Sequence, residues 1–161
     1  MTPVDVVVLS WNRAAATCAA IGSALAQEDV DVRVWVVDQG SSPEHLAAIA
    51  GYCAGHPAVE LIELGRNVGV RGGGKTGTRR GTAPWVASID NDAVFADGRC
   101  LRRMVDRFTA DPALGAVAFR ADNFHTGELD LTSWAYPGPL VARADEPFPA
   151  ARFVGVGHGI R

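Results

Sequence analysis

Cysteine is scarce in this chain, and its spacing fits neither a disulfide framework nor a zinc site. The 161 residues contain three cysteines, Cys18, Cys53 and Cys100, with no Cys-x-x-Cys pair and no Cys/His ligand spacing. An odd number of widely spaced cysteines leaves no complete pairing. We therefore interpret them as small core residues.

Long apolar runs and an excess of positive charge are also missing. No window reaches the roughly 18 apolar residues of a membrane span, and no basic stretch precedes an apolar run at the start of the chain. We expect no transmembrane segment and a cytoplasmic protein. A net charge of -3 and a pI near 5.7 give no field that attracts phosphate backbones, so we expect no nucleic-acid partner.

The residues that are present describe an ordinary globular domain. The chain is 48% hydrophobic and 20% charged, which lies far from the composition of disordered segments. Its length matches one domain with a single core. We therefore treat residues 1–161 as a single α/β domain.

Strand and helix patterns alternate along the first part of the chain. The predicted strands are residues 4–9, 32–37, 59–64 and 85–89, and the predicted helices are residues 14–26, 44–54 and 70–82, the last interrupted by glycines. This order predicts a Rossmann-like fold, with a mostly parallel open sheet and helices on both faces. Ligands of such sheets bind at the carboxyl ends of the strands.

The rest of the chain follows this pattern only loosely. A helix is predicted over residues 97–110, a strand over 113–119 and a last strand over 152–156. Between them, residues 122–151 are rich in proline, glycine and aromatics, and irregular segments of that length are often functional lids.

The tripeptide Asp90-Asn91-Asp92 follows an apolar run and carries the strongest chemical signal. In extended chain, residues i and i+2 project to the same side, so the two carboxylates are expected to converge. Such oxygen ligands suit Mg²⁺ or Mn²⁺, which complete their shells with phosphate and water. The alternative is a turn that satisfies its own backbone after a strand.

Four segments occur in an order that resembles the family 2 glycosyltransferases of the GT-A fold. They are VDVVVLSWNR, VRVWVVDQGSS, NVGVRGGGKTG and WVASIDND. The resemblance covers residues 3–98 well and the remainder loosely. It implies a metal-dependent transfer of a sugar from a nucleoside diphosphate sugar to an unknown acceptor, with inversion as the family default.

The resemblance also assigns roles by position. It implies a nucleotide-sugar site made of Ser10, Trp11, Asn12, Arg13, Asp38, Asn67, Gly69, Lys75, Asp90 and Asn91. Asp38 is expected to accept hydrogen bonds from the base. Mn²⁺ or Mg²⁺ is expected at Asp90 and Asp92, with Asp92 as the direct ligand.

Simpler roles stand beside these assignments. Asp38 is also typical of a turn or helix cap, Trp11 of a packing aromatic, and Lys75 of a solvated helix residue.

The chain departs from the family pattern at Gln39 and at Gly74-Lys75. The first leaves the identity of the base open, and the second places a cation that could serve the pyrophosphate. In the family, the catalytic base lies beyond the strand that ends this chain. We therefore assign no catalytic residue, and expect the chain to be truncated and to bind donor without transferring sugar.

Three alternatives stand beside this interpretation, and the second of them lacks its expected motif. The segment from Gly69 to Thr76 fits the P-loop pattern G-x-x-x-x-G-K-[ST], as in a nucleotidase. A sugar-1-phosphate nucleotidyltransferase would need a glycine-rich loop after the first strand, where Ser10 to Arg13 contain no glycine. A non-catalytic nucleotide- or sugar-binding module is the third.

Overall fold

The valine-rich run at the start of the chain forms the central strand of the molecule. The computed structural model describes residues 1–153 and 155–161. In it, β1 (Thr2–Ser10) is buried along most of its length, as expected of β-branched residues covered on both faces. β1 pairs in parallel with β2 (Val30–Asp38) and β4 (Val86–Asp90), and β2 pairs in parallel with β3 (Val59–Glu63).

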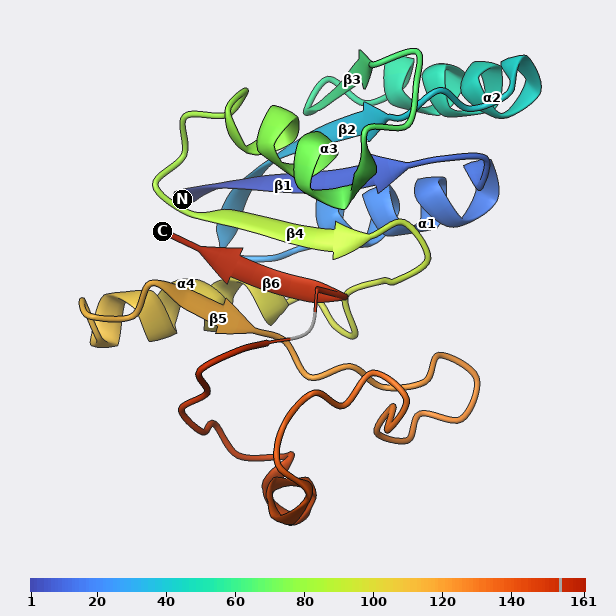
Figure 1. Ribbon diagram of the computed structural model, residues 1–161. Coiled ribbons are helices and arrows are strands. Elements are labelled where there is room, and N and C mark those ends of the chain that lie inside the picture. The colour runs from blue at the N-terminus through green and yellow to red at the C-terminus, as the bar shows by residue number, and fades with distance from the viewer. Residues whose placement is uncertain (154) are drawn as a thin grey trace.

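Two antiparallel strands complete the sheet, whose order is β3-β2-β1-β4-β6-β5 (Figure 1). β6 (Gly157–Ile160) lies between β4 and β5 (Ala116–Ala118) and is antiparallel to both. Three of the five strand pairs are therefore parallel, and the predicted mostly parallel open sheet is confirmed.

The last strand was predicted in the wrong place, because residues 152, 153, 155 and 156 are not in a strand. Val154, within that prediction, lies outside the described residues. The strand forms instead at Gly157–Ile160, where a Cβ on Gly159 would lie 2.1 Å from the Met104 sulfur. Close packing selects glycine here, although glycine is normally depleted in strands.

Helices cover both faces of the sheet, as predicted (Figure 1). The main core lies between one face and the helices α1 (Ala14–Leu25), α2 (Pro43–Ala54) and α4 (Cys100–Ala110). α3 (Gly69–Thr78) covers the other face over β1 and β2, where Val7, Trp35 and Val37 form a second buried cluster. No helix of the described part is long and apolar enough to cross a bilayer.

The segment between β5 and β6 is irregular, as predicted for residues 122–151. It contains one short 3-10 helix, Gly138–Arg143, and a group of aromatic rings formed by Trp134, Tyr136 and Phe148. Figure 1 shows this segment extending away from the sheet beyond β5.

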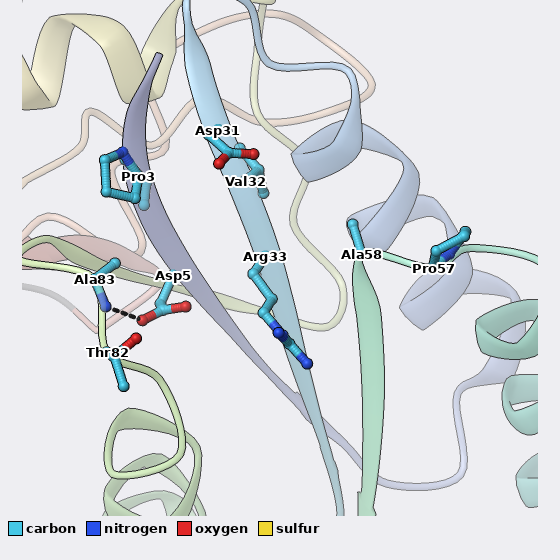
Figure 2. Close-up of a pocket in the computed structure, with 10 residues that line it drawn as sticks. Pro3, Asp5, Asp31, Val32, Arg33, Pro57, Ala58, Thr82 and Ala83 are labelled. Atoms are coloured by element: carbon cyan, nitrogen blue, oxygen red, sulfur yellow. Dashed lines mark hydrogen bonds between the residues drawn. The ribbon is translucent and has the colours of Figure 1, made fainter.

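A buried carboxylate organises the amino edge of the sheet. Asp5, which is 3% exposed, accepts hydrogen bonds from Trp35 Nε1 at 2.8 Å and from the Ala83 amide at 2.8 Å. A cavity of about 350 Å³ opens beside it, and Figure 2 shows Asp5, Arg33 and Thr82 among its lining residues. Both Asp5 oxygens are therefore engaged, and through them β1 is linked to β2 and to the segment that leads into β4.

Candidate functional site

The carboxyl ends of three parallel strands meet at one edge of the sheet. Ser10 is in register with Asp38, and Leu9 with Asp90. β2 lies on one side of β1 and β4 lies on the other, so the strand order reverses at β1. Open α/β sheets bind their ligands at such a switch in strand order. We call Trp11, Asn12, Arg13, Asp38, Asp90 and Asp92 the carboxyl-edge site.

The loop after β1 is fixed by backbone contacts to the loop after β2. Asn12 has a φ of 54°, a left-handed conformation that asparagine tolerates better than most residues. Its Oδ1 accepts a hydrogen bond from the Ser42 amide at 2.7 Å, and its own amide donates to Ser41 Oγ at 2.9 Å. Trp11 next to it is 52% exposed, so about half of this residue is open to solvent.

Asp38 shapes the loop that follows it. Its carboxylate accepts hydrogen bonds from the amides of Gly40 and Ser41, each at 3.0 Å, and from the Ser41 hydroxyl. Asp38 is also buried, so its turn-forming role is present in the structure. A carboxylate has about four lone-pair positions, and three of those on Asp38 are occupied. A nucleobase that contacts Asp38 must therefore use the fourth position or displace the Ser41 hydroxyl.

Ser10 and Asn91 join a small polar network beneath the edge. The hydroxyls of Ser10 and Thr17 lie 3.2 Å apart, and Asn91 Nδ2 donates to Thr17 Oγ1 at 3.3 Å. Ser10 is buried, so its hydroxyl does not line an open pocket. Sequence analysis missed Thr17, although a hydroxyl within an alanine-rich apolar helix was a signal for it.

The tripeptide with the two aspartates lies in a turn at the end of β4. β4 ends at Asp90, and the Ala93 amide donates to the Asp90 carbonyl at 3.1 Å. The expectation of extended chain across Asp90 and Asp92 is therefore wrong, because the strand ends at the first of them. Burial raises the pKa of Asp90, and the negative charge of Asp92 raises it further. The two carboxylates are thus close enough to repel each other.

The donor set fits a magnesium or manganese ion that also binds phosphate. Two mutually repelling carboxylates gain from a shared cation, and the described residues bring no third His, Cys, Asp or Glu to such a group. Mg²⁺ commonly uses one or two protein carboxylates and takes its other ligands from phosphate and water. Arg13 supplies positive charge here, because its guanidinium forms an ion pair with Asp92.

Asn67 and Gly69 shape the start of α3 at the same edge. Asn67 Oδ1 accepts a hydrogen bond from the Gly69 amide at 2.8 Å, and Gly69 has a φ of 76°. Gln39 Oε1 accepts from the Val68 amide at 3.2 Å. Lys75 is exposed in the last turn of α3, which is about 9 Å along the helix from Gly69. Among the described residues, no hydrogen bond or ion pair joins the Lys75 side chain to the carboxyl-edge site, and its role at the pyrophosphate stays a prediction.

The P-loop alternative is excluded by the local fold. In a P-loop, the glycine-rich residues form a loop around phosphate between a strand and a helix. Here Gly69–Thr78 is itself a helix, with Gly73 and Gly77 buried against the sheet. A Cβ on Gly77 would lie 2.5 Å from Val7 Cγ1, so glycine serves helix packing in this segment.

Comparison with known sequences gives consistent matches. The family described as glycosyl transferase family 2 matches residues 5–155. The succinoglycan biosynthesis protein ExoO of Rhizobium meliloti is 39% identical over 127 residues, which cover 79% of this chain and 34% of that protein. An N-acetylglucosaminyltransferase of Mesorhizobium japonicum is 28% identical over 139 residues, covering 81% and 32%. The chain thus spans about a third of the length of these curated relatives.

Solved structures share the fold. A mannosyltransferase from Pyrobaculum calidifontis, in complex with GDP-Man and Mn²⁺, superposes with a TM-score of 0.76 at 23% identity, covering 98% of this chain and 44% of that one. S. aureus TarS in complex with UDP-GlcNAc gives 0.66 at 14% identity, covering 84% and 39%. The sheet and its helices are therefore those of GT-A glycosyltransferases.

Proposed function

The chain belongs to glycosyl transferase family 2, and from this premise we propose that it forms the donor-binding part of an enzyme that transfers sugar from a nucleoside diphosphate sugar. The observation that carries the proposal is the carboxylate pair Asp90 and Asp92, opposite Arg13 at the switch in strand order. A diphosphate with a divalent cation is the ligand whose charges match this arrangement.

Each residue of the carboxyl-edge site has a chemical task in this proposal. The exposed ring of Trp11 offers a face on which the base can stack. The loop held by Asp38 and Asn12 fixes the position of that ring relative to the strand ends. Arg13 can bind diphosphate oxygens through a charge-assisted pair.

Asp90 and Asp92 are the proposed ligands of Mn²⁺ or Mg²⁺. When bound, the metal supplies positive charge that stabilises the departing diphosphate. The half-buried Asp90 holds its carboxylate at the strand end, while the exposed Asp92 reaches it from the following turn. Sugar transfer to the acceptor is proposed to invert the anomeric carbon, and the acceptor's chemistry is left open.

A calorimetric titration tests the proposal. UDP, GDP, dTDP and ADP are titrated into the protein with and without Mn²⁺, and at least one is expected to bind with strong metal dependence. Asp92→Asn should remove the metal-dependent part of that binding. Asp106→Asn is the matched control, because Asp106 is likewise exposed and paired with an arginine, but lies on α4.

Two results would contradict the proposal. One is binding by Asp92→Asn with the affinity and metal dependence of the parent protein. The other is metal-independent binding of all four nucleotides. The expectation that this chain binds donor without transferring sugar is tested separately, by incubating it with the sugar conjugate of the bound nucleotide, Mn²⁺ and a panel of acceptors. Release of free nucleoside diphosphate in step with sugar transfer would contradict that expectation.

A further inference from the structure

An ion pair joins two loops of the carboxyl-edge site that are far apart in sequence. The guanidinium of Arg13, in the loop after β1, contacts Asp92 Oδ2, in the turn after β4. Their side chains are 59% and 53% exposed. Ion pairs this exposed are weak and readily exchange partners.

The backbone of Arg13 is held much more firmly than its charged end. Asn12 is fixed by its contacts to Ser41 and Ser42. The Arg13 carbonyl accepts a hydrogen bond from the Thr17 amide at 2.8 Å, which begins α1. The backbone of Arg13 is therefore fixed at the edge where β1 and β4 end, while its exposed guanidinium can change partners.

The acidic pair depends on this cation for charge balance. Asp90 ends β4 and Asp92 lies two residues further along the chain, so two carboxylates stand at the same strand end. Within residues 1–153 and 155–161, the ion pair with Arg13 is the one salt bridge that reaches either carboxylate. A metal ion that binds Asp92 has to compete with Arg13 for the same carboxylate.

We propose that Arg13 is an exchangeable counter-ion of Asp92. It neutralises Asp92 in the absence of ligand; when a metal–diphosphate binds, the metal takes its place at Asp92 and the diphosphate becomes the new partner of the Arg13 guanidinium. The inference rests on the proposed function and adds a coupling to it. Metal alone displaces Arg13 without providing a replacement partner, whereas metal and nucleotide together provide one. The two ligands should therefore bind cooperatively, and this cooperativity acts equally on both affinities.

The test measures Mn²⁺ binding by the electron paramagnetic resonance signal of free Mn²⁺, alone and with UDP or GDP. Arg13→Gln should bind Mn²⁺ alone about two- to fivefold more tightly than the parent, because the competing ion pair is gone. The factor by which either nucleotide increases Mn²⁺ affinity should be about fivefold or more in the parent and clearly smaller in Arg13→Gln.

Two control variants isolate the charge and its position. Arg13→Lys keeps a cation and should bind Mn²⁺ alone nearly as the parent does. Arg33→Gln removes an arginine of similar exposure, 57%, whose partner Glu60 lies outside the carboxyl-edge site, and should change neither quantity. Circular dichroism confirms that each variant is folded.

Unchanged Mn²⁺ affinity and unchanged coupling in Arg13→Gln would overturn the role of Arg13. If the parent still shows metal-dependent nucleotide binding, the proposed function survives that result. If the parent binds nucleotide without any dependence on Mn²⁺, the proposed function and this inference fall together.

Discussion

Asp90 is a residue whose environment opposes its own charge. Burial and the neighbouring Asp92 raise its pKa above the ordinary value, so the folded protein binds a proton there more readily than the unfolded chain does. The charged form thus costs stability at neutral pH; this cost begins to shrink as the pH falls through the raised pKa and disappears below the ordinary pKa of the unfolded chain. Unfavourable charge of this kind is typical of a binding site.

We expect Asp90→Asn to stabilise the protein at pH 7, by an amount within the about 0.5–2 kcal/mol usual for stabilising substitutions. The gain should shrink as the pH falls through the raised pKa of Asp90, because the parent carboxyl then becomes protonated. Urea unfolding at pH 7, 5.5 and 4.5 measures both effects. A variant that is less stable than the parent at pH 7 would show that Asp90 makes a favourable interaction that we have missed.

Asp38 combines loop formation with a proposed contact to the base. We expect Asp38→Ala to weaken binding of the preferred nucleotide far more than binding of pyrophosphate with Mn²⁺, because the loss affects the base end. Calorimetry with both ligands measures this difference. Ser41→Ala, which removes one of the three hydrogen bonds, serves as the control for loosening of the loop. Equal losses for nucleotide and pyrophosphate would argue against any contact with the base.

The element least expected from its composition is α3. Its ten residues include five glycines, and each glycine in a helix interior costs about 1 kcal/mol relative to alanine. Gly77 lies against Val7 and Val37, where a Cβ would be 2.5 Å from the nearest methyl carbon, whereas Gly74 has nothing within 4 Å. One glycine is thus required by packing, and the other is not.

These two glycines give a matched pair of substitutions in one helix. Gly74→Ala should stabilise the protein by about 0.5–1 kcal/mol, since alanine favours the helix and meets no neighbour. Gly77→Ala should destabilise it by about 1–2 kcal/mol, because overpacking outweighs the helix gain. Urea denaturation followed by circular dichroism compares them. Equal stabilisation by both would mean that α3 is not closely packed on β1.

Sequence patterns predicted the elements whose periodicity reflects burial. The apolar runs of β1 and β2 and the spacing of Leu101, Met104, Val105 and Phe108 in α4 were sufficient. β6 was misplaced because its strand contains two glycines in close contacts, Gly159 against α4 and Gly157 against Phe119, and no local preference signals such contacts. The strand ends at Ser10, Asp38 and Asp90 meet at one edge, as the parallel sheet predicts, while the binding roles of the site residues stay predictions. The Thr17 network had one signal, a hydroxyl in an apolar helix, whereas the Arg13–Asp92 pair could not be foreseen, since it joins residues distant in sequence.

At the scale of the whole molecule, Asp5 connects three strands at the edge opposite the site. It binds Trp35 of β2 and the Ala83 amide before β4, and a Cβ on Gly81 would lie 2.0 Å from its carboxylate. Asp5→Ala should destabilise the fold by about 2–4 kcal/mol, because it leaves two donors without partners. Asp5→Asn, which keeps one acceptor, should cost about half as much.

Unfolding measurements with a nucleotide titration separate stability from binding in these variants. The folded fraction of each Asp5 variant should bind the nucleotide with an affinity within about twofold of the parent's, because the carboxyl-edge site lies at the other end of the strands. Stability of Asp5→Ala within about 0.5 kcal/mol of the parent would show that other groups satisfy the two donors.

The position of β6 also has a consequence for the order of folding. β6, the last strand of the described sequence, lies between β4 and β5. Residues 157–160 must therefore be synthesised before either of those strands can pair with β6. Until then β4 presents an unpaired edge, a surface open to pairing with another chain. The parallel half of the sheet can form during synthesis, but its closure waits for a contact of long sequence separation, which is slow to form. Chaperone dependence should therefore be concentrated in the interval between the synthesis of β4 and that of β6.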